Sequence, residues 1–416
     1  MKTPLCSAAI LLAVSLPAAD WAQWRGPNRD GHVSATIAAL PREPKALWSI
    51  PVGNGQASPI VAGSKLIYLD EQGGQEVAHA VDLKTGKPLW QAAVGESEAF
   101  ENTYGTGPRC TPLVDGDRLY VQTCRGEFRC LSLADGKTVW RTNFGTDWAA
   151  PFLGNKNRTP EANQTAARRH GNNGSPVIDG DRVFVPVGSP TKGTLVAFDK
   201  KTGKVLWTAG NENTAYSSLM VGTLAGTRQV IHLTGDSLMG VDVGSGKILW
   251  QTPVKTGAKR HVLTPILADN SVTISSSSIG LTKFTVSKDS GGFKLEPAWK
   301  NDKVKITLAT PVLVNGHLYG LGTGAKTEFI CVDFKTGELK WSHPGFGDYA
   351  AVIAAGDKLL VQDMTGTMLL LKASPEKFEE LGRIQVCGNT WSHPAIADGK
   401  IYQRDKKQLF ALEIGK

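Results

Sequence analysis

The residues best suited to binding chemistry recur at one fixed place, two positions ahead of the first residue of each of eight short hairpins. They are Gln56, Arg109, Asn173, Tyr216, Val262, Leu308, Tyr349 and Trp391. If the eight positions meet at one point, an aromatic plate beside a guanidinium and an amide is suited to hold a planar anionic ligand. The candidate ligand site is Arg109, Asn173, Tyr216, Tyr349 and Trp391. Ordinary packing at the strand ends is the alternative interpretation.

No other residues form a recognisable catalytic or metal-binding motif. The eight His are scattered, and no pair has the spacing of a zinc site. No Gly-x-Ser-x-Gly turn or phosphate-binding loop stands between a strand and a helix. Glu101, Glu212 and Asp348 are isolated carboxylates in loops that lead to the same end of the strands. The sequence therefore predicts no metal site and leaves the catalytic residues unidentified.

The longest interruption in the chain, residues 145–171, precedes the third hairpin and falls at the same end of the strands. An insertion of this length without structure of its own is usually functional or disordered. We weigh two roles equally, a lid over the binding site and a loop that contacts a partner. The candidate contact residues of this insertion are Trp148, Arg158, Arg168, Arg169 and His170.

The elements that must position these residues come from an internal repeat. Its clearest copy runs from Val81 to Trp90, with Asp82 and a Thr-Gly-Lys turn between. Its Trp returns at intervals of 42 to 67 residues, a period that fits four short strands, the size of a propeller blade. Gly takes the positive φ of the turn. We expect the Trp to wedge between blades, at Trp48, Trp90, Trp140, Trp207, Trp250, Trp299 and Trp341.

Eight hairpins, one in each period, set the number of blades. They begin at Ser58, Thr111, Ser175, Ser218, Thr264, Thr310, Ala351 and His393. Residues 409–416 contain the first part of one more repeat without its Trp, and residues 45–48 supply the missing part. The sequence therefore predicts an all-β, eight-bladed propeller of four-stranded antiparallel blades. The N-terminal and C-terminal strands pair in the last blade and close the ring. We expect one propeller domain over 44–416, after an N-terminal segment over 20–43.

Composition, charge and the first residues set the expected location. Of 416 residues, 41% are hydrophobic and 20% are charged, which argues against a disordered chain. Residues 1–19 have the basic start, apolar run and small-residue end of a secretory signal, so we expect a periplasmic or secreted protein. No later run has the roughly 18 apolar residues of a transmembrane helix. The net charge of +8 is spread along the chain without a nucleic-acid-binding tail, and we expect a monomer.

The repeat resembles that of the PQQ-like (quinoprotein-type) propellers, with their Ala-x-Asp-x-x-Thr-Gly-Lys-x-x-Trp motif. The resemblance covers nearly all of the chain from about Trp21. Residues 21–31 are similar to the start of exported members common in planctomycetes and related bacteria. The wider family implies two kinds of function. Its pyrroloquinoline quinone (PQQ) alcohol dehydrogenases are enzymes with Ca²⁺ and an adjacent Cys pair, whereas its BamB-type members are scaffolds without cofactor.

The residues favour the scaffold over the enzyme, because no two Cys are adjacent and no carboxylate motif is present. We expect a non-catalytic module that holds a protein partner, or a small anionic or planar ligand, at the face with the 145–171 insertion. The first alternative is a PQQ-dependent alcohol dehydrogenase, with PQQ and Ca²⁺ near Arg109, Asn173 and Trp391. The second is a carbohydrate- or polymer-binding propeller that stacks its ligand on Tyr216, Tyr349 and Trp391.

Overall fold

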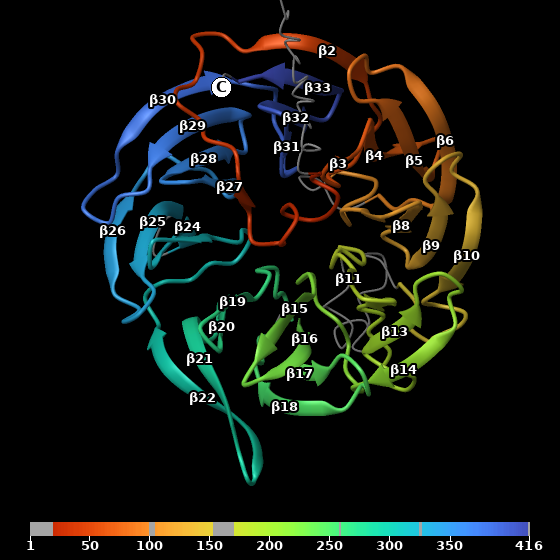
Figure 1. The fold of residues 1–416 in the computed structure, drawn as a ribbon, viewed down its shortest axis with the longest axis vertical. Coiled ribbons are helices and arrows are strands. Elements are labelled where there is room, and N and C mark those ends of the chain that lie inside the picture. The colour runs from red at the N-terminus through yellow and green to blue at the C-terminus, as the bar shows by residue number, and fades with distance from the viewer. Residues whose placement is uncertain (1–19, 100–104, 153–169, 258, 324–326, 415–416) are drawn as a thin grey trace, which may run out of the picture.

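The chain folds into a ring of eight antiparallel sheets, which confirms the predicted eight-bladed propeller (Figure 1). The computed structural model describes residues 20–99, 105–152, 170–257, 259–323 and 327–414. The strands β3, β11, β15, β19, β27 and β31 lie toward the central axis, and β6, β10, β14, β18, β22, β26, β30 and β2 lie at the rim (Figure 1). Within these ranges no helix has the length and apolar character needed to span a bilayer.

The strands follow the chain around the ring, four to a blade. Blades 1 to 4 consist of β3 (Ile60–Ala62), β4 (Lys65–Gln72), β5 (Gln75–Asp82), β6 (Pro88–Glu96); β7 (Leu113–Asp115), β8 (Arg118–Gln122), β9 (Glu127–Ser132), β10 (Thr138–Asn143); β11 (Val177–Asp179), β12 (Arg182–Val185), β13 (Leu195–Asp199), β14 (Val205–Ala209); and β15 (Met220–Leu224), β16 (Thr227–Leu233), β17 (Ser237–Asp242), β18 (Ile248–Pro253).

Blades 5 to 8 continue the series, and two of them take strands from the N-terminus. They consist of β19 (Ile266–Ala268), β20 (Ser271–Ser276), β21 (Gly280–Asp289), β22 (Gly292–Asn301); β23 (Val312–Val314), β24 (His317–Thr323), β25 (Thr327–Asp333), β26 (Leu339–His343); β27 (Ala350–Ala355), β28 (Lys358–Asp363), β29 (Thr367–Lys372), β30 (Glu380–Gln385) with β1 (His32–Val33); and β31 (Ala395–Ala397), β32 (Lys400–Arg404), β33 (Gln408–Glu413) with β2 (Lys45–Pro51).

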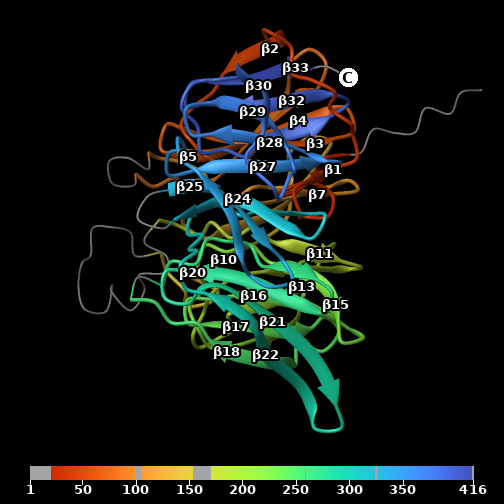
Figure 2. The same ribbon diagram turned by 90° about the vertical axis from the view of Figure 1, so that its left-hand side faces the viewer.

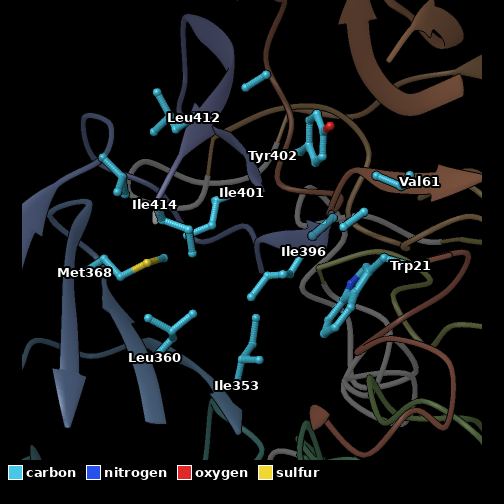
Figure 3. Close-up of a cluster of buried hydrophobic side chains, with 14 of the residues drawn as sticks. Trp21, Val61, Ile353, Leu360, Met368, Ile396, Ile401, Tyr402, Leu412 and Ile414 are labelled. Atoms are coloured by element: carbon cyan, nitrogen blue, oxygen red, sulfur yellow. The ribbon is translucent and has the colours of Figure 1, made fainter. Parts of the chain in front are cut away.

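The ring closes in blade 8, where the two ends of the chain meet. β2 pairs antiparallel with β33, and Trp48 lies opposite Ala411 in that register. The predicted closure is therefore confirmed, and it leaves no open edge between the first and last blades. A buried cluster spans this junction, with side chains from blades 7, 8 and 1 and from Trp21 (Figure 3). The closing strand is thus held by packing as well as by its backbone hydrogen bonds.

Six of the seven repeat Trp residues lock one blade to the next by a hydrogen bond from the indole to the following blade. The Trp48 indole N–H donates to the Leu83 carbonyl at 3.1 Å, and the Trp48 ring lies against Gly86, whose φ is +69°. A side chain at Gly86 has no room, since a Cβ there lies 2.8 Å from the Trp48 ring. The indole hydrogen bond to the next blade recurs at Trp90, Trp140, Trp207, Trp299 and Trp341.

Trp250 packs in a buried cluster that joins blades 4 and 5, as expected, but its hydrogen bond departs from the pattern of the other repeat Trp residues. Its indole N–H donates to Oε1 of Gln229 within its own blade, and its ring covers Gly240. The next blade explains the change, because β21 and β22 pair over ten residues each and carry their turn far out from the ring (Figures 1 and 2). Blade 5 therefore has no Thr-Gly-Lys turn against which the Trp250 ring could pack.

The docking of Trp48 on Gly86 predicts a measurable cost for a single methyl group. Gly63→Ala tests backbone strain alone, since Gly63 has a φ of +56° and nothing within 4 Å of a Cβ. We expect that variant to lose about 1 kcal/mol of unfolding free energy in urea. Gly86→Ala adds the clash with Trp48 and is expected to lose about 2 kcal/mol more. Equal losses in the two variants would contradict the docking role of the turn.

Candidate functional site

The eight positions singled out in the sequence come together in one pocket on the propeller axis. Each stands just before the first strand of its blade, so the ring places one from every blade around a common centre. The pocket has about 1090 Å³ of empty volume, its open mouth included. Its wall contains Gln56, Arg109, Asn173, Tyr216, Val262, Leu308, Tyr349 and Trp391.

The hydroxyls of Ser58, Ser218 and Thr310, which open three of the hairpins, tie neighbouring blades together directly beside this pocket. The Ser175 N–H donates to the Ser218 Oγ, and the Thr264 N–H donates to the Thr310 Oγ1, both at 3.0 Å. Between blades 8 and 1, the His393 N–H donates to the Ser58 Oγ at 3.0 Å. Buried backbone amides that no ladder can reach are satisfied in this way. The recurring Ser or Thr is therefore a structural device that fixes the spacing of the pocket wall.

Residues 20–33, here called the axial segment, run through the centre of the ring and contact every blade. Among their backbone contacts, the Trp21 and Ala22 carbonyls accept the N–H groups of Val61 and Val114, in blades 1 and 2. The opposite side of the ring is reached by β1, which pairs in parallel with β27 of blade 7. Side-chain contacts reach the other blades at Ser175, Pro176, Leu219, Thr264, Pro311, Leu313 and His393.

The axial segment forms the floor of the pocket and divides the channel. Trp24 and Arg25 line the pocket, and the Trp24 indole N–H donates to the Thr264 Oγ1 at 3.0 Å. Arg25 also borders a second cavity, of about 580 Å³, together with Arg29 and His32. Within the described part of the chain, this segment separates the two spaces, and the pocket lies on the side of the loops that lead into the first strand of each blade.

Two arginines of the axial segment are buried at the axis. Arg25 and Arg29 are 2% and 3% exposed. Arg25 donates through Nη2 to the Pro311 carbonyl at 2.8 Å. Arg29 donates to the carbonyls of Leu219 and Pro176, at 3.0 and 2.9 Å. Burial lowers the pKa of Arg25 to about 10 and that of Arg29 to about 9, because the charged form loses its hydration.

The aromatic part of the wall is a stacked pair. The rings of Tyr349 and Trp391 lie 5.5 Å apart at 8°. Beneath them His393 contacts the rings of Trp21 and Trp24, with centroids 6.3 and 5.5 Å away. Burial lowers the pKa of His393 to about 3, so this imidazole is neutral at physiological pH. The pocket therefore offers flat apolar surface and no titration near neutrality from His393.

The structure brings together part of the residues proposed from the sequence. Arg109, Asn173, Tyr216, Tyr349 and Trp391 share the pocket, and His170 joins them, its N–H donating to the Tyr216 hydroxyl at 3.2 Å.

His170 is the one described residue of the insertion that lines the pocket. Trp148 is buried in the core between blades 2 and 3, and its indole N–H donates to the Thr142 Oγ1 at 2.8 Å. Arg158, Arg168 and Arg169 lie outside the described residues, as does the isolated carboxylate Glu101.

Among the pocket residues that the sequence did not single out, Trp24, Arg25 and Arg260 have the largest or charged side chains. The first two lie in the axial segment, which carries no repeat signal of its own. Arg260 follows Lys259 in a basic cluster that reads as ordinary surface. Val262, two positions ahead of the fifth hairpin, identified the correct loop of the pocket. The charged side chain of that loop, Arg260, was not identified.

The described lining does not fit a calcium–quinone centre. Calcium needs several oxygen ligands, usually with carboxylates among them. Among the described residues no Asp or Glu lines the pocket, and no group of three His, Cys, Asp or Glu is placed to hold a metal ion. Cys110, Cys124, Cys130, Cys331 and Cys387 are all free and buried. The chemistry this wall supports is recognition by guanidinium groups and aromatic faces.

Comparison with known proteins finds relatives described as assembly factors and also relatives described as enzymes. One of the enzymes is polyvinylalcohol dehydrogenase from Sphingopyxis sp. (strain 113P3), 27% identical over 158 residues, covering 32% of this chain and 23% of its own. The sequence pattern of the family described as "Outer membrane protein assembly factor BamB" matches residues 73–343. The protein of that description from Yersinia pestis is 21% identical over 397 residues, covering 80% of this chain and 91% of its own. The one from Burkholderia pseudomallei (strain K96243) is 27% identical over 185 residues, covering 40% of this chain and only 45% of its own.

A solved structure shows the same architecture. The crystal structure of BamB from Moraxella catarrhalis superposes with a TM-score of 0.58 over 89% of this chain and 98% of that one. Its sequence identity to this chain is 14%, so this likeness shows the fold alone.

Proposed function

Because this chain belongs to the family of outer membrane protein assembly factor BamB, a family of PQQ-like propellers, we propose that it is a binding and scaffold module. Its partner or ligand sits on the propeller face where the axial pocket opens. We place the protein in the periplasm or outside the cell, as its first 19 residues suggest. The described pocket wall lacks the carboxylates of a calcium–quinone site, which favours this function over the dehydrogenase.

One observation carries the proposal: a residue from every blade lines a single pocket, which lies on the side of the loops that lead into the first strand of each blade. The hydroxyl hydrogen bonds between hairpins fix the wall, and the axial segment fixes the floor. Concave sites of this kind, largely pre-formed and lined by aromatic groups with a few polar ones, are the usual places of binding. At their opposite ends the innermost strands continue into short turns such as the one at Gly180, and the cavity beneath the axial segment is smaller, at about 580 Å³.

A photo-crosslinking experiment in the native cell envelope tests the choice of face. A benzophenone amino acid replaces exposed Arg260 at the pocket mouth, and in a matched protein it replaces exposed Asp181. Asp181 lies in the turn at the far end of β11, on the other face. We expect adducts with identified outer membrane proteins or their assembly components from position 260 and none from 181. Equal labelling at both positions, or labelling from 181 alone, would refute the proposed face.

A second measurement separates the scaffold from the enzyme. The purified protein is titrated with PQQ in the presence and absence of Ca²⁺, and dye-linked alcohol oxidation is then assayed. A scaffold gives no Ca²⁺-dependent alcohol oxidation. Activity that requires Ca²⁺ and disappears in Trp391→Ala would instead establish the dehydrogenase.

A further inference from the structure

The axial pocket combines positive charge with a complete lack of acidic side chains among its described residues. Arg25, Arg109 and Arg260 all line it, and no Asp or Glu does. In a concave site with apolar walls, charges of one sign reinforce each other and attract the opposite ion. The net charge of the whole chain is only +8 over 416 residues, so positive charge is concentrated in the pocket relative to the rest of the protein.

No salt bridge with a described residue neutralises the charge at the floor of the pocket. Arg25 forms no salt bridge with any described residue, and its Nε has no hydrogen-bond partner there. The Asp30 carboxylate, which accepts the His32 N–H at 3.0 Å, acts on the Arg25 charge through space but forms no salt bridge with it. Arg29, directly below, donates to backbone carbonyls and to the Gln23 side chain only. Buried charges in proteins are normally paired, so the Arg25 guanidinium, which lines the pocket without a salt bridge to a described residue, favours an anion there.

The aromatic groups define the rest of the ligand. Trp391 and Tyr349 form a stacked pair at one side of the pocket, and Trp24 adds a third ring at the floor. Aromatic faces gain most from flat rings placed parallel or edge-on to them. A guanidinium recognises a carboxylate in a planar, two-point fashion, which suits a ring and a carboxylate in one plane.

We propose that the axial pocket binds a small aromatic carboxylate, its ring against Trp391 and Tyr349 and its carboxylate directed to the arginines of the wall and floor. The inference rests on the proposed function, because it takes the pocket-bearing face as the binding face. It goes further in naming the chemical class of the ligand. The axial segment is part of this site, since it supplies both Trp24 and Arg25.

The test uses 2-naphthoate as the probe, with binding followed by calorimetry and by the fluorescence of the pocket Trp residues. We expect saturable binding of one molecule for each chain, weakened by salt and unchanged by Ca²⁺. The neutral analogue 2-naphthalenemethanol keeps the ring, and cyclohexanecarboxylate keeps the charge. Each is expected to bind about tenfold more weakly or worse, because each loses one half of the recognition.

Two variants assign the binding to the pocket. Trp391→Leu removes the ring platform, and Arg260→Gln removes a charge at the exposed mouth, where folding is not at risk. We expect at least about tenfold and about threefold weaker binding, respectively. Arg42→Gln, exposed and outside the pocket, is the matched control and leaves binding unchanged.

Three outcomes would overturn the inference: no saturable binding of 2-naphthoate, equal binding of the neutral analogue, or unchanged binding in Trp391→Leu. A strict requirement for Ca²⁺ would also overturn it, since the arginines would then not suffice. These results are distinct from failure of the proposed function, which the crosslinks from position 260 decide. Crosslinks without naphthoate binding leave the scaffold standing and remove only the carboxylate ligand.

Discussion

Arg29→Ala is expected to lower the free energy of unfolding by about 3 kcal/mol, measured by urea denaturation. The Arg29 guanidinium donates to three backbone carbonyls, those of Ser175, Pro176 and Leu219. Alanine leaves these buried acceptors without a donor and opens a cavity at the axis. The three hydrogen bonds stabilise the fold, but burying the cation costs part of that free energy, as the lowered pKa of about 9 indicates. The expected loss of stability is therefore smaller than the sum of three charge-assisted hydrogen bonds.

The control for this variant is Arg42→Ala. Arg42 lies in the same N-terminal region but is exposed, so its removal is expected to change stability by no more than about 0.5 kcal/mol. Arg29→Met adds a second comparison, since it keeps the apolar stem of the side chain and loses the hydrogen bonds. If Arg29→Ala is as stable as Arg42→Ala, the axial segment does not hold the blades together.

The expected loss follows from the place of Arg29 in the ring. Neighbouring blades contact each other through the Trp wedges at the rim and the hairpin hydroxyls near the axis. Arg29 links blades 3 and 4 from the inside, and the same segment reaches the other blades through short hydrogen bonds and ring contacts. Removal of the Arg29 side chain is therefore expected to loosen the axial segment, which positions Trp24 and Arg25 in the pocket. Stability of the ring and geometry of the pocket depend on the same 14 residues, 20–33.

The parts of this architecture that repeat could be predicted from the sequence. Each Thr-Gly-Lys turn receives a Trp of the preceding blade, and this short-range rule is written into every copy, as at Gly86 and Gly203. The pocket positions followed for the same reason. Once the ring was assigned, a residue at constant distance from each hairpin had to lie at a constant distance from the axis.

The parts that do not repeat could not be predicted. Trp24 and Arg25 meet partners 240 and 286 positions away, and nothing in the local pattern of residues marks such pairs. Trp250 has the repeat spacing, yet its indole N–H donates within its own blade because the long β21–β22 hairpin withdraws the turn it would contact. The repeat thus predicted where the pocket lies and which loops form its wall. Which charged side chains line it depends on individual long-range contacts that the repeat does not encode.

Glu76→Gln is expected to stabilise the protein at alkaline pH and to flatten the dependence of stability on pH. Glu76 is fully buried on β5, its Oε1 accepts the Cys124 N–H at 3.1 Å, and it forms no salt bridge with a described residue. The groups that face it are the Cys124 thiol and the Arg109 guanidinium. Burial raises its pKa from 4.5 to about 7, although the hydrogen bonds from Cys124 and the charge of Arg109 act in the opposite direction.

The sign of the effect follows from that raised pKa. Between about pH 4.5 and 7 the folded chain holds a proton at Glu76 that the unfolded chain has lost, so stability falls as the pH rises through this window. The full loss is on the order of 3 kcal/mol and is complete above pH 7. Glutamine has the shape of the protonated acid and cannot ionise. At about pH 8 Glu76→Gln should therefore gain roughly that amount over the natural protein, and at about pH 4 almost nothing.

Urea unfolding at several pH values, compared between the two proteins, measures this difference directly. Glu296→Gln, at an exposed position on β22, is the control and should follow the natural protein at every pH. Parallel curves for Glu76→Gln and the natural protein would mean that Glu76 does not hold a proton in the fold. Arg109 lines the pocket and faces this carboxyl, so the ionisation of Glu76 also sets how much of the Arg109 charge is available to a ligand. An anion should consequently bind more tightly below pH 7, where the carboxyl is neutral, and Glu76→Gln should keep that tighter binding at higher pH.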